Sequence, residues 1–573
     1  MVYIPILQIR IVVSSASGRF WVNSCYSFGM KARILLPLLF FLLVLSFTER
    51  RAHGASPLWQ SVGTGIEYRE FYLPEPDHLY VARMDRTDPL VTLESSIAQG
   101  RLSGGLETVR EQALRYDQAI NYWSESWGAR NQVVVAINGS FYDPDTGIPW
   151  SGMLHSGWYA KRFEDRQNAS GFAWTLGRQA FVGGCVMHRA GKQLITFLSD
   201  NEMLNFNGIN IIRGKNELII YTPQYDASTL TGDGGVEVLV ELNRPMMIMP
   251  TPDMITGTVK EIHEGQGSTL IPFDHMVLSA SGTAAEGLLK KATIGEKIGI
   301  SQELRHFESD CRTPSPISWT KAYAGVSSDF TFLANGEIRG NNDLGAILRN
   351  PRTAIAFNDR YIFFIVVDGR DRLRSLGMSM VELANFAKNT LGASWGIALD
   401  GGGSSTMVVN GEVRNSPNAE LVEQEANLDI TPEAGLIHPV DLGASSAIQA
   451  GAIASSPGVS SLLESRAMQD AAQKIERAVA NGMMMVVVQP RQRSTRFLTG
   501  DQVIISGSGE VNVRLGPGTN YPVMTTLSPG SQCIVLAHQL NGVLAKGSFW
   551  WKIASGDVAG WVSEDLIALQ TAP

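Results

Sequence analysis

The sequence predicts an α/β (mixed α+β) large domain with a mixed sheet, followed by a small all-β barrel. Three observations predict this fold class. Apolar segments of strand length alternate with turn residues over most of the chain, helical patterns are few, and the C-terminal segment has its own rhythm of short strands and tight turns. The chain has 573 residues, of which 44% are hydrophobic and 57 are glycine. This composition excludes a wholly disordered protein and is typical of a loop-rich protein with much β structure.

The charge balance argues against a nucleic-acid partner. The chain carries 47 Lys and Arg residues against 55 Asp and Glu residues, which gives a net charge of −8. Proteins that bind nucleic acids need a basic face that displaces counterions from the phosphate backbone. An acidic chain of this kind is expected to act on other partners.

The N-terminal region has the three-part pattern of a secretory signal peptide. A basic stretch at residues 30–33 is followed by an uncharged apolar run at 34–47 and by small residues before Ala55. The run is short for a permanent helix across a bilayer of about 30 Å. We therefore interpret residues 30–54 as a signal peptide and residues 1–29 as an upstream artefact of start-codon choice. The product is expected to be secreted or on the cell surface, with membrane contact only if the signal is uncleaved.

The cysteines allow at most one intramolecular disulfide in the exported chain. Cys25 precedes the signal peptide, which leaves Cys185, Cys311 and Cys533. The pair to test is Cys185–Cys311. No Cys-X-X-Cys motif is present in the sequence, so nothing in it indicates a structural zinc site.

The large domain is predicted at residues 55–490. Its apolar runs predict strands, and three amphipathic stretches predict helices near 106–122, 282–290 and 379–391. The strongest strand candidates are Val133–Ile137, Leu218–Tyr221, Val236–Leu242, Tyr361–Val367, Trp395–Leu399 and Thr406–Val409. Residues 419–470 are rich in Ala, Ser, Gly and Glu and are interpreted as a flexible insertion. A further strand at Met483–Val488 indicates that this insertion interrupts the domain, and residues 491–501 form the linker that follows.

Two of these strands end in an Asp-Gly pair. The Tyr361 strand ends in Asp368-Gly369-Arg370, and the Trp395 strand ends in Asp400. Between them, Ser379 and Glu382 form a capping-box pattern that predicts the start of a helix. Because a helix joins the two strands, we expect parallel pairing, which brings Asp368 and Asp400 to one edge of the sheet.

The loop after the second strand suits an anionic ligand. Its sequence is Gly401-Gly402-Gly403-Ser404-Ser405, in which glycines expose backbone N–H groups and serines add hydroxyl donors. Two carboxylates beside such a loop and Arg370 suit cleavage of a bond to a phosphorylated group, with one carboxylate as nucleophile or base. The alternative is that both Asp-Gly pairs simply end strands in turns.

These residues resemble the phosphodiester glycosidase family. The resemblance rests on D-G-R-x-x-x-x-S-x-G-M at Asp368–Met378 and L-D-G-G-G-S-S-T-M at Leu399–Met407, with further matches near Asn138, Arg352 and Asn481. The family implies hydrolysis of a sugar–phosphate diester. Carried over position by position, the resemblance gives as site candidates Asn138, Arg352, Asp368, Arg370, Ser375, Asp400, Gly402, Ser404 and Ser405. With the residue pattern above, we predict that Asp400 and Asp368 are catalytic, and that substrate and phosphate are bound by the other seven together with Gly401 and Gly403. Ser140 stands where the family commonly has a glycine.

The segment at residues 502–570 resembles a bacterial SH3-like domain. It contains the N-x-R-x-G-P-x-x-x-Y stretch from Asn512 to Tyr521 and a closing Gly-Trp-Val strand at Trp561. Such domains usually bind cell-wall peptides or glycans. The aromatic residues of this segment, Trp550 and Trp551 among them, have a second interpretation as core residues of a small barrel.

Together these patterns predict a secreted glycoside hydrolase that cleaves sugar-1-phosphodiester linkages in cell-wall or extracellular polymers. The expected substrate is a phosphorylated glycan, and the SH3-like domain is expected to hold a wall peptide or glycan. No cofactor is indicated with certainty, and calcium or magnesium near Asp368 or Asp400 stays open. The alternatives are a wall-binding surface protein without activity and a peptidoglycan amidase or peptidase.

Overall fold

The computed structural model describes most of the chain after the predicted leader. The described residues are 58–570, except for 124–125, 164–169, 184–185, 245, 307–318, 329 and 418–474. The predictions for residues 1–54, for the 419–470 insertion and for the Cys185–Cys311 pair therefore fall outside the described residues. Cys533 is buried as a free thiol. In the described part of the chain, no helix is long and apolar enough to cross a membrane.

The prediction of a mixed α/β large domain is wrong. Strands hold 49% of the residues and helices only 10% in the described part of the chain. The strands form five sheets, and among the named strands only β13 (Gly208–Ile209) and β14 (Leu218–Tyr221) pair in parallel. The physical reason is the short connections between the apolar runs, because antiparallel strands can be joined by tight turns whereas parallel strands need long crossovers.

The first sheet carries the two Asp-Gly strand ends. Its strands follow the order β1-β2-β3-β23-β22-β24-β20-β21, with every pair antiparallel. Their bounds are β1 (Gln60–Gly63), β2 (Ile66–Leu73), β3 (Asp77–Asp85), β20 (Phe330–Ala334), β21 (Glu337–Ile338), β22 (Arg352–Phe357), β23 (Tyr361–Val367) and β24 (Trp395–Ala398).

The predicted parallel pairing of β23 with β24 is also wrong, because β22 lies between them. The apolar run of β22 turns sharply at Asn358, whose side-chain oxygen accepts hydrogen bonds from the N–H groups of Arg360 and Tyr361. This turn makes β22 and β23 a hairpin, and β24 then pairs with the other side of β22. Since β22 is antiparallel to both neighbours, β23 and β24 still run in the same direction. Their carboxyl ends therefore reach one edge, as expected from the sequence.

A second sheet packs against the first. It has the order β26-β25-β6-β27-β4, and β5 pairs with β6. Its strands are β4 (Val91–Ile97), β5 (Ile120–Trp123), β6 (Ser126–Asn138), β25 (Met407–Val409), β26 (Glu412–Val413) and β27 (Asn481–Gln489). The strand predicted at Met483–Val488 thus lies within β27, between β6 and β4. Chain from both sides of residues 418–474 builds this one sheet.

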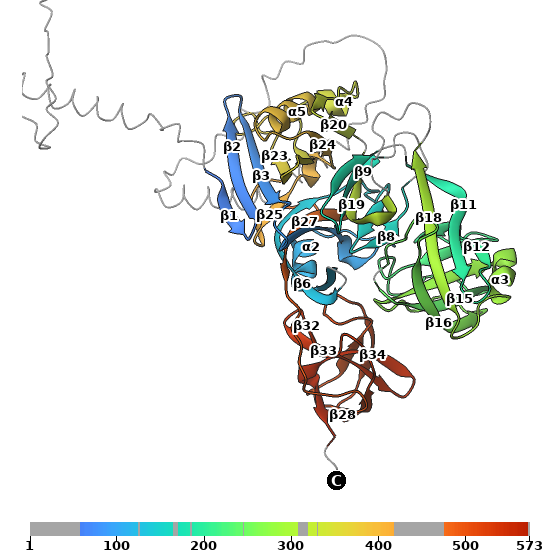
Figure 1. The fold of residues 1–573 in the computed structure, drawn as a ribbon. Helices are drawn as coiled ribbons and strands as arrows, with labels where there is room; N and C mark the ends of the chain where they lie inside the picture. The colour runs from blue at the N-terminus through green and yellow to red at the C-terminus, as the bar shows by residue number, and fades with distance from the viewer. Residues whose placement is uncertain are drawn as a thin grey trace, which may run out of the picture. The chain divides into compact units, whose positions relative to one another are not determined.

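A large core lies between these two sheets, and each sheet has a helix on its other face. Residues Ile362, Phe364 and Val366 of β23 face the shared core, whereas the residues between them pack against α5 (Met380–Asn389). Figure 1 shows α5 beside β23 and β24. The second sheet is covered by α2 (Val109–Tyr116) in the same way. Each fully buried large apolar side chain stabilises the fold by about 1.5–3 kcal/mol, so a strand buried on both faces is a strong anchor for the residue that follows it.

Both helices begin with a capping box, of which the sequence analysis predicted the one at Ser379. The Ser379 side chain accepts a hydrogen bond from the N–H of Glu382, and the Glu382 side chain accepts one from the N–H of Ser379. Thr108 and Glu111 form the same pair of hydrogen bonds at the start of α2. Glu382 is therefore a helix cap. The short helix α4 (Leu344–Ile347) precedes β22.

Two further sheets form the part of the molecule drawn from cyan through green to yellow-green in Figure 1. One has the order β10-β9-β19-β7-β8, and the other has the order β12-β11-β18-β16-β15-β17-β14-β13, with α3 (Gly282–Leu289) packed on it. The remaining bounds are β7 (Met153–His155), β8 (Trp158–Lys161), β9 (Ser170–Thr175), β10 (Ala180–Gly183), β11 (Val186–Phe197), β12 (Met203–Asn205), β15 (Gly235–Leu242), β16 (Ile255–Glu264), β17 (His275–Ser281), β18 (Lys297–His306) and β19 (Ala322–Ser328).

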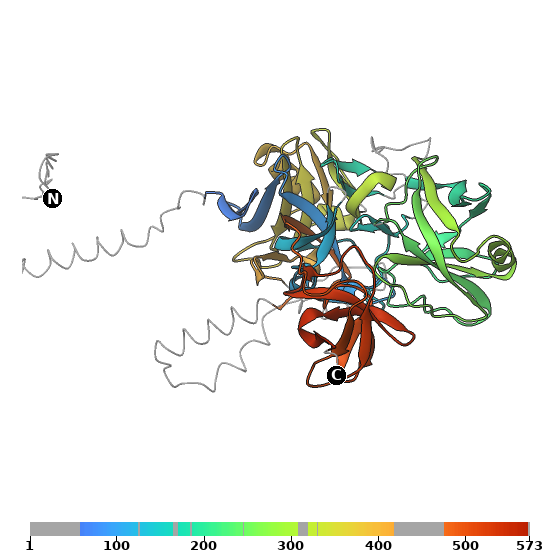
Figure 2. The same ribbon diagram turned by 60° about the horizontal axis from the view of Figure 1, so that its bottom comes forward.

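The C-terminal segment forms the predicted small β structure, drawn in red in Figures 1 and 2. Its strands are β28 (Gln502–Ile505), β29 (Val511–Arg514), β30 (Val523–Leu527), β31 (Gln532–Val535), β32 (Val543–Ala545), β33 (Ser548–Ser555), β34 (Val558–Ser563) and β35 (Ile567–Leu569). Trp550, Trp551 and Trp561 are all buried. Trp551 belongs to the core of this segment, as the second interpretation of these aromatic residues expects.

Candidate active site

The candidate site lies where three neighbouring strands of the first sheet meet its edge. Arg352 begins β22 and lies opposite Val367, the last residue of β23. On the other side of β22, the N–H of Leu399 donates to the carbonyl oxygen of Thr353 at 2.9 Å. The register therefore brings Asp368, Arg352 and Asp400 to one edge, although their order across the sheet differs from the predicted one.

Asp400 is held by its backbone, and the residue as a whole is half-buried. Its N–H donates to the carbonyl oxygen of Gly139 at 3.0 Å, and its own carbonyl oxygen accepts from the Asn138 side-chain amide at 2.7 Å. Burial raises the pKa of Asp400 to about 6, against the opposing effects of Ser404 and the positive charge of Arg477. A carboxylate with a pKa near the working pH suits proton transfer.

Two residues beside Asp400 were missed by the sequence reasoning. Tyr142 donates a hydrogen bond to the carbonyl oxygen of Ala478 at 3.1 Å. Burial and the negative charge of Asp400 raise the pKa of Tyr142, and Ser404 and Arg477 oppose that rise. Tyr142 directly follows the Asn138 motif, which is the signal that could have found it. Arg477 lies beyond the 418–474 segment, and no local pattern marks it.

Asp368 has a different environment from Asp400. It is only 8% exposed, and its carboxylate accepts hydrogen bonds from Tyr80 Oη at 3.0 Å, Asn415 Nδ2 at 3.1 Å and the N–H of Ser416 at 3.1 Å. Burial raises the pKa of Asp368, and the hydrogen bonds from Asn415 and Ser416 oppose this. Asn415 Nδ2 also donates to the carbonyl oxygen of Ser405 at 2.8 Å, so Asp368 is connected to the glycine-rich loop through one side chain.

A chain of polar side chains extends from Asp368 across β3 and β2. Tyr80 Oη lies 2.9 Å from His78 Nδ1, and His78 Nε2 lies 3.0 Å from Glu70 Oε2. His78 also stacks on the ring of Tyr72, with 4.1 Å between ring centroids. The hydrogen bond to His78 is the main cause that lowers the pKa of Glu70 to about 2. This network fixes the ring of Tyr80 against Asp368, and no motif in the sequence pointed to it.

The two predicted arginines differ in what they contact. Arg352 is 7% exposed, and its guanidinium donates to the carbonyl oxygens of Met378, Gly345 and Leu348 at 2.6–2.7 Å. Burial and the nearby charge of Arg370 lower the pKa of Arg352 to about 10. The Arg370 guanidinium lies beside Gly402, where an added Cβ would meet its Nη2 at 3.4 Å. Arg352 therefore braces the loops around β22, and Arg370 lies against the glycine-rich loop.

Ser375 and Asn138 have their hydrogen bonds within the protein. Ser375 Oγ donates to the carbonyl oxygen of Asp368 at 2.6 Å and accepts from the N–H of His78 at 3.1 Å. Asn138 is fully buried, and its side-chain oxygen accepts from Thr353 Oγ1 at 2.7 Å and from the N–H of Thr406 at 3.1 Å. These contacts place both residues in the scaffold of the site.

The glycine-rich loop uses several of its own N–H groups. The N–H of Gly402 donates to the carbonyl oxygen of Pro351, and those of Ser404 and Ser405 donate to Gly401 and Gly402. Gly402 has a φ of 61°, a backbone conformation that favours glycine. The loop is thus a tight turn, η3 (Gly402–Ser404), with fewer donors left for an anion than its sequence suggests. The buried hydroxyls of Ser405 and Thr406 have no hydrogen-bond partner among the described residues.

The side chains of the candidate site do not form a ligand set for the calcium or magnesium ion that the sequence analysis left open. Within the described ranges, no group of three or more His, Cys, Asp and Glu residues is arranged to hold a metal ion. The site contains the carboxylate of Asp400, which titrates near neutral pH, and the phenol of Tyr142. It also contains two arginines, Arg370 against the glycine-rich loop and Arg477 near Asp400. Such a set can move a proton and hold a negatively charged group.

Comparison with protein families identifies two segments of the chain. Residues 255–427 match the model of the phosphodiester glycosidase family, and residues 509–568 match the model of the bacterial SH3 domain. Both resemblances are confirmed. The phosphodiester glycosidase match includes every predicted site residue except Asn138, and it leaves out Tyr80, Tyr142 and Arg477.

Solved structures show distant likenesses to the chain. A hypothetical protein from Synechocystis is 14% identical with a TM-score of 0.45, and the match covers 75% of this chain and 64% of that one. The catalytic domain of zebrafish N-acetylglucosamine-1-phosphodiester alpha-N-acetylglucosaminidase, auto-inhibited by its pro-peptide, is 14% identical with a TM-score of 0.26, covering 64% of this chain and 78% of that one. No curated protein matches the chain.

Proposed function

We propose that the chain is a secreted or cell-surface glycoside hydrolase that cleaves sugar-1-phosphodiester linkages in cell-wall or extracellular polymers. The family match over residues 255–427 supports hydrolysis at a phosphodiester-linked sugar. The observation that carries the proposal is the carboxylate of Asp400, whose pKa burial raises to about 6 beside Arg477 and Ser404. The SH3 domain supports a second contact with the same polymer.

In this proposal the two predicted aspartates have different roles. Asp400 reacts, as the base that takes a proton from the attacking water or as the nucleophile at the sugar carbon. Asp368 holds the loop in place, because three donors already occupy its carboxylate and Asn415 joins it to Ser405. Arg370 holds the phosphate, since its guanidinium lies against Gly402.

The bond chemistry follows from the leaving group. Water adds its oxygen to the anomeric carbon, the bond from this carbon to the phosphate oxygen breaks, and the electron pair leaves with the phosphomonoester. A phosphomonoester is a weakly basic leaving group, so it needs less help from a general acid than a sugar alcohol does. One carboxylate that titrates near neutral pH and one arginine beside the loop are sufficient for this reaction.

The test is hydrolysis of a panel of nitrophenyl sugar-phosphodiesters in water labelled with oxygen-18. We expect the label in the released sugar and none in the phosphomonoester, because the carbon–oxygen bond is cut. Label in the phosphate would mean phosphodiesterase chemistry and would contradict the proposal. Repeating the assay with a chelator tests whether a divalent cation is needed. No turnover on the whole panel, together with retained binding to wall material, would favour the wall-binding protein without activity.

A further inference from the structure

The SH3 domain has two clusters of buried aromatic residues, and only one of them is its own core. Trp551 of β33 and Val562 of β34 lie opposite each other and pack in that core. Trp550 and Trp561 directly precede them on the same strands, so their side chains point to the other face of the sheet. They are only 4% and 2% exposed, because they lie in a second cluster that includes Phe273 of the large domain. The large domain therefore helps to cover aromatic side chains that face away from the core of the SH3 domain.

Phe273 lies between β16 and β17, and three rings of the SH3 domain pack around it. The distances between ring centroids are 5.6 Å to Tyr521, 5.8 Å to Trp561 and 6.0 Å to His538. Rings at such separations attract one another beyond the area that they bury. Tyr521 and Trp561 also belong to the two motifs on which the resemblance to bacterial SH3 domains rests. We call these three rings the socket, and a side chain of the large domain fills it.

The backbone around Phe273 is fixed by two hydrogen bonds. Its N–H donates to the carbonyl oxygen of Leu515 in the SH3 domain at 3.1 Å. The N–H of His275 donates to the carbonyl oxygen of Pro272 at 2.9 Å, which closes a turn with Phe273 and Asp274 at its centre. The turn brings both of these side chains to the SH3 domain.

Asp274 adds a charged contact to the same surface. The residue is 3% exposed, and its two carboxylate oxygens have different partners. Oδ1 lies 2.6 Å from Nδ1 of the adjacent His275, and Oδ2 lies 3.0 Å from Nε2 of His538 in the SH3 domain. The N–H of Leu540 donates to His538 Nδ1 at 3.1 Å, so the ring proton of His538 is on Nε2 and points to Asp274. The SH3 domain thus has a donor for a carboxylate within the socket.

An aromatic socket with a donor for a carboxylate has the features of a peptide-binding site. SH3 domains bind proline-containing segments in grooves lined by aromatic rings. In this chain the segment Pro272-Phe273-Asp274 carries a proline, a ring and a carboxylate, and it already fills the socket. We propose that this segment is a built-in ligand, which closes the socket to peptides from outside the chain. The contact includes neither Asp400 nor Asp368, so the proposal stands independently of the proposed hydrolysis.

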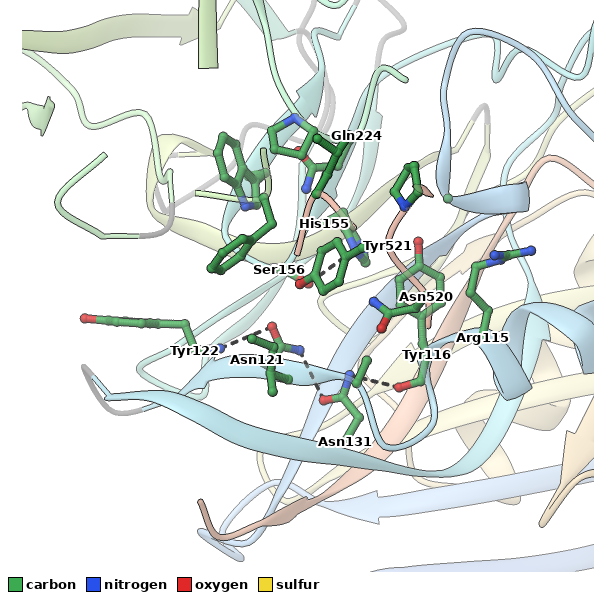
Figure 3. Close-up of a pocket in the computed structure, with 18 of the residues that line it drawn as sticks. Arg115, Tyr116, Asn121, Tyr122, Asn131, His155, Ser156, Gln224, Asn520 and Tyr521 are labelled. Atoms are coloured by element: carbon green, nitrogen blue, oxygen red, sulfur yellow. Dashed lines mark hydrogen bonds between the residues drawn. The ribbon is translucent and has the colours of Figure 1, made fainter. Parts of the chain in front are cut away.

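A pocket beside the socket gives an external peptide a way in. Tyr521 and Phe273 both line this pocket, together with Asn121 and Tyr122 of the β5–β6 hairpin (Figure 3). A competing peptide can therefore reach the edge of the socket while the other contacts of the SH3 domain are still in place. The peptide that fits has the chemistry of the segment it displaces, an aromatic side chain next to a carboxylate. Any contact of the socket with an external partner first requires Phe273 to leave.

The test is binding of a synthetic peptide with the sequence of residues 268–276 to the full exported chain, measured by calorimetry. A double variant with Phe273→Ala and Asp274→Ala, which empties the socket, should bind this peptide at least about tenfold more tightly than the wild type. The reason is that the wild-type socket is free only in the small fraction of molecules in which Phe273 has left it. A peptide with alanine in place of the phenylalanine and the aspartate should bind neither protein.

Lys546→Met is the matched control for the double variant. Lys546 Nζ donates to the carbonyl oxygens of Leu114 and Asp117 at 2.8 and 2.7 Å, so this variant loses contacts of the SH3 domain with the large domain outside the socket. It should bind the peptide as weakly as the wild type. Equal affinity of the wild type and the double variant, or binding to neither, would overturn the proposal. Tight binding to Lys546→Met would also overturn it, because the whole interface and not the segment would then close the socket.

Hydrogen exchange without any peptide gives a second measurement. In the double variant, exchange should become faster at residues 515–522 and 538–541, which include the contacts of the segment. It should stay unchanged at residues 503–505 and 551–553, which belong to the core of the SH3 domain. Faster exchange throughout the SH3 domain would mean that Phe273 is part of what folds it, and unchanged exchange everywhere would mean that other contacts keep the socket closed. Either result would contradict a built-in ligand.

Discussion

The two aspartates at the edge of the first sheet are both buried enough to raise their pKa values, but they differ in their hydrogen-bond partners. Asp368 is 8% exposed and accepts hydrogen bonds from Tyr80, Asn415 and Ser416. Asp400 is partly exposed, its backbone is fixed, and burial raises its pKa to about 6. Both follow buried strands and both precede a glycine, so the sequence presents them as equivalent. The difference teaches that the position on the sheet brings the carboxylates together, while the surrounding donors decide which of them is available for chemistry.

The largest effect that this comparison predicts is the loss of turnover in an Asp400→Asn variant. Removal of a general base typically costs 10²–10⁴-fold, so we expect the rate on a sugar-1-phosphodiester to fall by about a thousandfold. Because the base must be ionised, the activity of the wild type should rise as the pH increases through about 6. The measurement is kcat/KM against pH.

Asp359→Asn is the matched control for this variant. Asp359 is exposed in the turn at the opposite end of the β22–β23 hairpin and should tolerate the change without loss of rate. A fully active Asp400→Asn protein would remove Asp400 from the mechanism.

The second prediction concerns Asp368 and is primarily a loss of stability. Asp368→Ala leaves the donors Tyr80, Asn415 and Ser416 without their shared acceptor, so we expect the free energy of unfolding to fall by about 3 kcal/mol. Asp368→Asn keeps an oxygen for Asn415 and Ser416 and should recover part of both the stability and the activity. Denaturant unfolding and kinetics on the two variants check this. If Asp368→Asn is as inactive as Asp400→Asn while remaining folded, Asp368 is itself a reacting group.

The sequence predicts those features of the site that depend on residues close together in the chain. The buried strand Tyr361–Val367, the helix cap at Ser379 and the shared edge of the two aspartates follow from local patterns, and the structure has all of them. The fold class did not follow, because the antiparallel strand β22 was not recognised between the two predicted strands. Its short apolar run, with a three-residue turn after it, carries little periodic signal.

Local patterns could not predict which residues contact the two aspartates, because these residues are far away in the chain. Tyr80 lies 288 residues before Asp368 in the chain, and Arg477 lies beyond the 418–474 segment from Asp400. Contacts of this kind are set by tertiary packing, which a single sequence does not show. Arg352 illustrates the converse case. Its position at the edge was predictable, but the three carbonyl oxygens it contacts depend on how α4 and its flanking loops fold back.

A third prediction concerns the pH dependence of stability. The pKa of Asp400 is about 6 in the folded protein and about 3.9 in unfolded chains. The folded state therefore binds the proton more tightly, and the free energy of unfolding should fall as the pH rises from about 4 to about 6. Asp400→Asn lacks this titration. Because Asp400 is partly exposed, we expect the variant to exceed the wild type by about 2 kcal/mol above pH 7 and by little below pH 4.

Denaturant unfolding of both proteins between pH 4 and pH 8 gives this difference, in which the other titrating groups cancel. If the two stability curves run parallel over the whole range, Asp400 does not titrate differently in the folded and unfolded states. In that case the pKa of Asp400 in the folded protein is that of an exposed carboxylate.

The smallest predicted effect tests the network behind Asp368. Tyr80→Phe removes the hydroxyl that joins Asp368 to His78, while Asn415 and Ser416 still donate to the carboxylate. We expect the free energy of unfolding to fall by about 1 kcal/mol, which is typical for one hydrogen bond. Tyr72→Phe is the matched control, because its hydroxyl donates to Glu70 at the exposed end of the same network. Denaturant unfolding of the two variants should rank Tyr80→Phe as the more damaging. The reverse order would mean that the network stabilises the surface of the sheet and does not support Asp368.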